Sequence, residues 1–175
     1  MKQAVIAITG PTGAGKSTIS QGLAKKLDRC VYLEIDNVKH MLISGFSHKT
    51  NENGEERWSF SEWKQVGESV GLLCANFLAN GFSVVAGGYM HEEGWLELEK
   101  QCVLTNKFIL LPSKEVIKFR DAERDSIYTM GNAAIKQHFN YLTEKQFFKD
   151  FMVLDSTDQT VDQTVEELLR RIAGV

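Results

Sequence analysis

The sequence predicts an α/β fold in which a parallel sheet of five strands carries helices on both faces. Two observations support this prediction. Short apolar runs rich in β-branched residues alternate along the whole chain with segments of helical periodicity. The first run, residues 3–8, is apolar and partly β-branched after Gln3, which is typical of a strand buried on both faces. Alternating strands and helices indicate right-handed crossovers between parallel strands.

The predicted elements follow one another in a regular order. We expect strands at residues 3–8, 30–35, 82–87, 107–112 and 151–156. We expect helices at residues 17–28, 36–44, 59–81, 92–101, 113–125, 132–142 and 160–174. Asp36 and Ser113 stand where helix caps are expected, and Gly45 and Gly81 stand where helices end. Residues 46–57 are polar and lack periodicity, so we expect a mobile surface segment there.

Composition places the chain among ordinary globular proteins. It has 175 residues, of which 43% are hydrophobic and 25% charged, with a net charge of −3. No basic field favours a nucleic-acid partner, and no polybasic or long apolar run favours a membrane. No repeat or linker interrupts residues 1–175, so we expect one domain, and the cytoplasm is the default location.

The three cysteines of the chain are Cys30, Cys74 and Cys102. They are far apart in the sequence, and no pair of them has the spacing of metal ligands. We therefore expect buried, reduced thiols.

A glycine-rich segment between the first strand and the first helix carries the main functional signal. It reads Gly10-x-x-x-x-Gly15-Lys16-Ser17, with Gly13 inside it. Glycines leave room for backbone N–H groups to surround the oxygens of a triphosphate, and the helix N-terminus adds partial positive charge. Lys16 has the charge to reach the β- and γ-phosphates, and Ser17 is suited to ligate Mg²⁺.

This pattern predicts binding of ATP with Mg²⁺, where the alternative is a glycine-rich turn. The residues expected to contact the nucleotide in this loop are Gly10, Thr12, Gly13, Ala14, Gly15, Lys16, Ser17 and Thr18. The loop alone does not choose the reaction, because kinases, GTPases and ATP-driven machines share it.

Several segments together resemble the small P-loop kinases, a group that includes shikimate and gluconate kinases, chloramphenicol phosphotransferase, zeta-toxin-type kinases and nucleoside monophosphate kinases. The segments are GPTGAGKSTISQGLAKKL, LEIDNVKHMLISG, SKEVIKFRDAERD, MGNAAIKQHF and MVLDSTDQTVDQTVEELLRRI. The resemblance implies a three-layer P-loop fold with strand order 2-3-1-4-5. It also implies a small mobile lid at about residues 120–133 and ATP-dependent phosphorylation of a small molecule.

The resemblance also implies roles for two arginines of the lid. Arg120 would pack against adenine, and Arg124 would reach the transferring phosphate. Alternatively, both are solvated helix arginines paired with nearby acids. The lid lacks the further Arg-Pro pair of shikimate-type sequences, so charge stabilisation in the transition state would fall to Arg124 and Lys16.

Asp36 follows the second strand, at the sheet edge where ligands of open α/β folds collect. Its carboxylate is suited to accept a proton from an attacking hydroxyl or to hold Mg²⁺ through water. The resembling kinases often have an acidic residue at this point. The alternative is that Asp36 only caps the next helix.

The third strand ends in Gly87 and Gly88, where switches and machines usually carry an acid. We expect these glycines to open space beside the loop for an acceptor. The chain also lacks an Asn-Lys-x-Asp guanine signature, which favours a kinase over a GTPase.

The acceptor is expected to bind at about residues 37–63 and 88–95. The candidate contacts are Lys39, His40, Arg57, Trp58, Tyr89, His91 and Trp95. Each also has a simpler interpretation as a surface or packing residue. Trp63 is interpreted as packing, and His138 shows no partner in the sequence.

A small-molecule kinase that phosphorylates a hydroxyl is the leading hypothesis. A nucleoside monophosphate kinase is the first alternative, but Arg57 is the only arginine at residues 37–95 to hold an acceptor phosphate. The second alternative is a non-catalytic, nucleotide-binding regulatory module.

Overall fold

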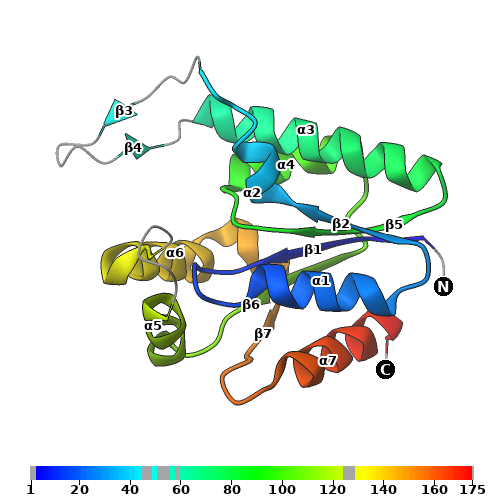
Figure 1. Ribbon diagram of the computed structural model, residues 1–175. Helices are drawn as coiled ribbons and strands as arrows, with labels where there is room; N and C mark the ends of the chain where they lie inside the picture. Colours follow the sequence, from blue (N-terminus) through cyan, green and yellow to red (C-terminus); the bar gives the residue numbers. More distant parts are fainter. Residues whose placement is uncertain (1–2, 45–48, 51–55, 58–59, 124–128, 175) are drawn as a thin grey trace.

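The computed structural model describes residues 3–44, 49–50, 56–57, 60–123 and 129–174, and at 49–50, 56–57 and 60 it describes the backbone alone. Its main sheet has the strand order β2-β5-β1-β6-β7, with all neighbours parallel (Figure 1). These strands are β1 (Val5–Thr9), β2 (Cys30–Glu34), β5 (Ser83–Gly87), β6 (Asn106–Leu110) and β7 (Met152–Leu154). The predicted fold class and strand order are confirmed.

The helices form a layer on each face of this sheet (Figure 1). They are α1 (Lys16–Lys26), α2 (Ile35–Lys39), α3 (Phe60–Ala79), α4 (Glu92–Gln101), α5 (Lys114–Ala122), α6 (Gly131–Glu144) and α7 (Val161–Ala173). Helices α1 and α7 cover one face, and α3 and α4 cover the other. No helix among the described residues is long and apolar enough to cross a bilayer.

Strand β1 shows why the sheet is buried on both faces. Val5 and Ala7 pack into the core under α3 and α4, whereas Ile6 and Ile8 pack into the core under α1 and α7. Side chains of a strand alternate between faces, so a strand with a helical layer on each side must be apolar throughout. This is the physical reason for the continuous apolar run in the sequence.

The structure differs from the prediction in the region after β2. Helix α2 ends at Lys39 rather than near residue 44, and its N-cap is Glu34. The interpretation of Asp36 as a cap is therefore wrong, because Asp36 lies inside the first turn of the helix. A short antiparallel pair, β3 (Lys49–Thr50) and β4 (Glu56–Arg57), lies in the segment for which no structure was predicted.

Smaller differences occur toward the C-terminus. A short 3-10 helix, η2 (Gln146–Asp150), precedes β7 and was not predicted. The cap of α5 is as expected, because Ser113 Oγ accepts a hydrogen bond of 3.3 Å from the backbone N–H of Val116.

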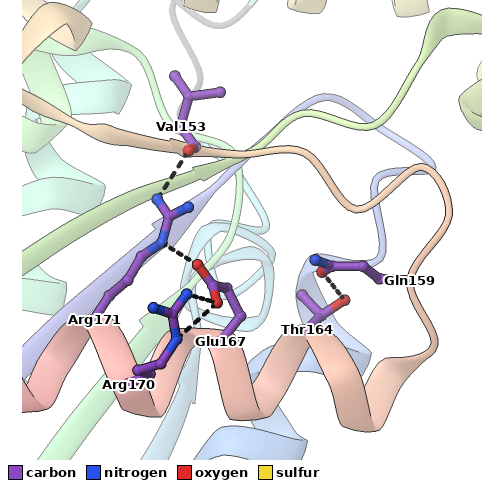
Figure 2. A network of polar contacts seen from close by, with 6 residues as sticks. All are labelled: Val153, Gln159, Thr164, Glu167, Arg170 and Arg171. Atoms are coloured by element: carbon purple, nitrogen blue, oxygen red, sulfur yellow. Dashed lines mark hydrogen bonds and ion pairs between the residues drawn. The ribbon is translucent and has the colours of Figure 1, made fainter. Parts of the chain in front are cut away.

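Helix α7 is tied to the edge strand β7 by a polar network (Figure 2). Arg171 Nη1 donates to the Val153 carbonyl oxygen at 3.1 Å, and Arg171 Nε lies 2.7 Å from Glu167 Oε1. Arg170 also pairs with Glu167. Because Arg171 donates to this carbonyl oxygen at the sheet edge, the oxygen is less available to pair with a strand of another chain.

Helices α3 and α4 meet at an unusually close glycine contact. A Cβ atom added at Gly67 would lie 1.9 Å from the carbonyl oxygen of Gly94. Only two glycines allow the helix backbones to approach this closely. The contact fixes the start of α4, and with it the loop from β5, against α3.

Candidate functional site

The phosphate loop connects β1 to α1 at the carboxyl edge of the sheet (Figure 1). Gly13 and Gly15 have φ angles of 76° and 89°, a region that favours glycine. A Cβ added at Gly10 would lie 2.5 Å from the Leu110 carbonyl oxygen, and one at Gly13 would lie 2.8 Å from that of Ile117. The glycines therefore serve backbone geometry and close packing against β6 and α5.

Lys16 begins α1 and is buried, at 9% exposure. Its Nζ donates to the carbonyl oxygen of Pro11, at 2.9 Å, within the loop that it is expected to serve. Ser17 and Thr18 follow in the first turn of α1 and are exposed. A charged ammonium and exposed hydroxyls at a helix N-terminus form an anion-binding arrangement.

The other two predicted loop residues, Thr12 and Ala14, have buried side chains. The backbone N–H of Ala14 donates to the Pro11 carbonyl oxygen at 3.2 Å, which closes a tight turn. Their expected contacts with a nucleotide would therefore come mainly from the backbone.

Arg120 projects from α5 toward the phosphate loop. Its Nη1 lies 3.9 Å from the position that a Cβ at Gly15 would take. The next residue, Asp121, is buried and accepts hydrogen bonds from the backbone N–H groups of Met130 and Gly131, at 3.2 and 3.0 Å. Asp121 thus joins the two sides of the expected lid, whereas Arg124 lies outside the described residues.

An acidic group that the sequence analysis missed lies on the other side of the loop. Glu34 ends β2, and the Tyr32 hydroxyl donates a hydrogen bond to its Oε2. Glu34 Oε1 is buried, with no hydrogen-bond partner in the described structure. Burial raises the pKa of Tyr32, Glu34 adds to the rise, and a hydrogen bond with Ser17 opposes it. Every second side chain of a strand lies on the same face, so the spacing of Tyr32 and Glu34 in the sequence could have predicted that they lie together.

The expectation that Gly87 and Gly88 open space for an acceptor is wrong. A Cβ at Gly87 would lie 2.4 Å from Ser20 Oγ and 3.2 Å from Tyr32 Cε2. A Cβ at Gly88 would lie 2.5 Å from Ile35 Cβ. Side chains of α1, β2 and α2 already fill the space that the glycines leave.

Asp36 and Lys39 face each other on α2. Lys39 Nζ lies 3.9 Å from Asp36 Oδ1, and the Asp36 side chain is 42% exposed. Burial lowers the pKa of Lys39, and the charge of Asp36 opposes that shift. Lys39 Nζ also lies 5.4 Å from the centre of the Trp63 ring. The pair therefore connects the sheet edge to the aromatic residues of α3.

Five aromatic rings from three parts of the chain form what we call the aromatic wall. They are Trp63, Tyr89, His91, His138 and Tyr141. His91 stacks between Trp63 and Tyr141, with ring centres 5.0 and 4.5 Å apart. Tyr89 stacks on His138 at 4.0 Å. Tyr89 and His91 were predicted as acceptor contacts, whereas the sequence analysis missed His138 and Tyr141.

The aromatic wall is uncharged near neutral pH. Burial is the main cause that lowers the pKa of His91 to about 4, and it does the same for His138. The positive charges of Lys16 and Lys39 lower the His138 pKa further. Helix α6 begins beside the phosphate loop, because Asp121 of α5 accepts from the backbone N–H of Gly131 and α5 packs against Gly13 of the loop. Burial raises the pKa of Tyr141 to about 12.

The remaining predicted acceptor contacts do not join this site. Trp95 is fully buried, and its Nε1 donates to the Met90 carbonyl oxygen at 3.0 Å, so its assignment to the acceptor site is wrong. His40 is exposed at the end of α2. Trp58 and the side chain of Arg57 lie outside the described residues.

Among the described residues, no group of three or more His, Cys, Asp and Glu side chains could hold a metal ion. A Mg²⁺ ion at Ser17 would then take further ligands from phosphate and water, as Mg²⁺ commonly does. The exposed Ser17 hydroxyl and the unpartnered oxygen of Glu34 fit such an ion and its water shell.

Comparison with known proteins agrees with this geometry. Residues 2–86 match the family model of adenylylsulphate kinase, a stretch that runs from the N-terminus through the phosphate loop to β5. No curated protein matches the chain significantly.

Solved structures match the chain over nearly its full length. An unliganded sugar kinase from Janibacter sp. HTCC2649 has 18% identity and a TM-score of 0.73, covering 95% of this chain and 92% of its own. The tunicamycin resistance protein of Deinococcus radiodurans has 16% identity and a TM-score of 0.70, with coverages of 97% and 95%. Thymidylate kinase from Candida albicans has 17% identity and a TM-score of 0.64, with coverages of 99% and 92%.

The sheet order and the phosphate loop define the P-loop class of α/β proteins. Within that class, the chain has the fold of the small P-loop kinases, as the resemblance of its sequence implied.

Proposed function

We propose that this protein is an ATP-dependent kinase that transfers the γ-phosphoryl group of ATP to a hydroxyl of a small molecule. The observation that carries the proposal is the placement of an uncharged aromatic wall beside the phosphate loop, where Gly88, next to Tyr89, donates its backbone N–H to the carbonyl oxygen of Ile8 at 3.0 Å. Aromatic faces suit the body of a ring-bearing molecule, and the loop suits a triphosphate. Two different ligands can then meet at one sheet edge.

On the donor side, the loop N–H groups and Lys16 would bind the β- and γ-phosphates, and Arg120 would pack against the base. Lys16 would leave the Pro11 carbonyl oxygen to do so. When bound, Mg²⁺ neutralises charge on the phosphate oxygens. Ser17 would ligate the ion, and Arg124 would add positive charge from the lid.

On the acceptor side, Asp36 would orient the hydroxyl and accept its proton, or hold metal-bound water. Its carboxylate does not cap α2, since Glu34 is the N-cap, and its side chain is 42% exposed beside Lys39. Lys39 lies near both the Asp36 carboxylate and the Trp63 ring, so this carboxylate is close to the aromatic wall. Tyr89 and His91 would contact the body of the acceptor, and Arg57 remains a proposed contact.

An uncharged acceptor fits this site better than a phosphorylated one. His91 and His138 are neutral near pH 7, and the half-buried Lys39 already faces Asp36. The adenylylsulphate kinase match covers residues 2–86, which include the phosphate loop, Asp36 and Lys39 but not Tyr89 and His91. The similarity to a sugar kinase extends over both halves.

A nucleoside monophosphate kinase is the second candidate, favoured by the full-length similarity to thymidylate kinase. A phosphate acceptor needs cationic contacts, and Arg57 is the only arginine between residues 37 and 95. As a kinase that draws on ATP, the protein would act in the cytoplasm, with no requirement for nucleic acid or membrane.

The test is ADP release from Mg-ATP with a panel of sugars, hydroxylated antibiotics, nucleosides and nucleoside monophosphates. We expect a hydroxylated, uncharged compound to stimulate release, and Lys16→Ala to lose about 10²–10³-fold of that rate while remaining folded. Exposed Lys64→Ala on α3 is the matched control and should keep the rate. Stimulation by monophosphates alone would favour the second candidate. Binding of ATP without stimulation by any compound would favour a regulatory module, and near-normal turnover by Lys16→Ala would refute the kinase proposal.

A further inference from the structure

The aromatic wall presents three polar tips, which are the Tyr89 hydroxyl and the imidazole nitrogens of His91 and His138. We propose that these tips bind hydroxyl groups of the acceptor, which is then an unphosphorylated polyol such as a sugar or an inositol, and not a flat aromatic compound. This inference deepens the proposed function and rests on it, because it names the acceptor class of the same site.

The fold does not use these three tips for hydrogen bonding. Among the residues that the structure describes, the Tyr89 hydroxyl and the His91 nitrogens have no hydrogen-bond partner, and His138 Nδ1 is buried without one. The Tyr141 hydroxyl differs, because it accepts from the backbone N–H of Glu92 at 3.0 Å. Polar groups that are withdrawn from water without a partner are unfavourable unless a ligand or an ordered water completes them.

The ring faces of the wall are largely covered by other rings. Trp63 and Tyr141 stack on opposite faces of His91, because both rings cannot occupy one face. His138 covers one face of Tyr89, with the ring planes 22° apart, and Trp63 is only 4% exposed. A flat aromatic acceptor would need an open face to stack on. The wall therefore offers mostly ring edges and polar tips, which the stacking holds in fixed positions.

The hydrogen-bonding capacity of the tips matches that of hydroxyl groups. Burial lowers the pKa of His91 and of His138 to about 4, so each imidazole is neutral near pH 7, with one donor and one acceptor. Burial also raises the pKa of Tyr89, so its hydroxyl keeps its proton and can both donate and accept. An alcohol does the same, whereas a phosphate or a carboxylate only accepts and is bound best by cations. Uncharged tips therefore favour a polyol.

The tips are close enough together to bind one small molecule beside the phosphate loop. The ring centre of Tyr89 lies 4.0 Å from that of His138 and 5.7 Å from that of His91. Gly88, the residue before Tyr89, donates its backbone N–H to the carbonyl oxygen of Ile8 at 3.0 Å, near the end of the strand from which the loop starts. One hydroxyl of a bound polyol can then face the γ-phosphate while its neighbours bind the tips.

The first test compares acceptor classes in the ADP-release assay with Mg-ATP. The polyols are D-ribose, D-xylose, D-glucose, D-mannose and myo-inositol, and the flat aromatic alcohols are pyridoxine and 4-hydroxybenzyl alcohol. We expect at least one polyol to stimulate release and neither aromatic alcohol to do so. Deoxy derivatives of the active polyol that lack a bound hydroxyl should have a kcat/KM lower by about tenfold or more, because a polar tip is left unpaired.

The second test removes the tips and keeps the rings. Tyr89→Phe loses only the hydroxyl, and His138→Phe keeps a flat ring that can stack on Tyr89. We expect each variant to raise the KM for the active polyol about tenfold and to bind ADP within about twofold of wild type. His40→Gln, an exposed histidine at the end of α2, is the matched control and should keep the KM.

Combining the two tests separates recognition from a purely structural role. A variant and a deoxy derivative that lose the same hydrogen bond should together lose no more than about the larger single effect. A variant that only loosened the fold would instead show the full deoxy effect with every derivative.

The outcomes distinguish this inference from the proposed function. If an aromatic alcohol or another class of acceptor stimulated ADP release and no polyol did, the acceptor class would be wrong while the kinase proposal stood. Unchanged KM values in both variants, or additive losses with every deoxy derivative, would likewise overturn the role of the tips alone. If the protein bound Mg-ATP and no compound of any class stimulated release, the proposed function would fall, and the inference with it.

Discussion

Replacement of Gly67 by alanine tests whether the α3–α4 contact holds the acceptor side together. The new Cβ would lie 1.9 Å from the Gly94 carbonyl oxygen and 2.6 Å from Gly94 Cα. Carbon atoms that are not bonded prefer separations of about 3.5 Å, so the helices must move apart by roughly an ångström or more. The obstacle is backbone, which has no rotamer to relieve the contact.

The expected free-energy change combines two opposite effects. Overpacking typically costs about 1–3 kcal/mol, and a backbone obstacle places this site near the upper end. Alanine gains about 1 kcal/mol over glycine within a helix. The net loss is then about 2 kcal/mol of unfolding free energy, which corresponds to roughly 4–8 °C in Tm for a chain of this size.

Thermal and urea unfolding followed by circular dichroism would measure this loss. Gly22→Ala in α1 is the matched control, because its Cβ would meet a side-chain atom, Val165 Cγ2, at 3.0 Å. We expect the control to stay within about 1 kcal/mol of wild type. Because His91 is the N-cap of α4 and stacks on Trp63 of α3, acceptor binding should weaken while ADP binding remains. A Gly67→Ala variant as stable as the wild type would refute this reasoning.

Two further predictions concern pH and the nucleotide base. His91 and His138 have pKa values of about 4 in the folded protein against an ordinary 6.5, so the unfolded chain binds protons first as pH falls. Their contribution to stability should be complete above about pH 6.5 and decline toward pH 4. Urea titrations should show that the unfolding free energy falls less with pH in His138→Gln than in wild type, and as much as in wild type in the exposed control His40→Gln. An identical fall in wild type and both variants would contradict this prediction. Arg120→Ala should weaken ADP binding by about tenfold, both with and without Mg²⁺, through loss of a cation–π contact with the base. Phe119→Ala, at an exposed neighbouring position of α5, is the control variant. If Arg120→Ala and Phe119→Ala bound ADP with equal affinity, Arg120 would be excluded from the nucleotide site.

The fold was largely predictable because its signals are local. The continuous apolar run at residues 4–8 indicates a strand that is covered on both faces, and the alternation of strands with helices indicates parallel crossovers. The boundaries of α2 were less predictable, because Met41, Leu42 and Ile43 beyond Lys39 still fit a helical pattern. Its cap was misassigned because Asp36 is a good capping residue that lies two residues after the actual N-cap, Glu34.

The sequence by itself determined the phosphate loop, since Gly10 to Ser17 are contiguous and each residue type has a direct physical purpose. Only the tertiary structure decided the acceptor side. The aromatic wall joins residues from 63 to 141 through crossovers, and no spacing in the sequence reports such a meeting. The same holds for Gly87, whose missing side chain leaves room for Ser20 and Tyr32 rather than for an acceptor. A close contact between distant segments depends on how whole elements pack, which local patterns do not encode.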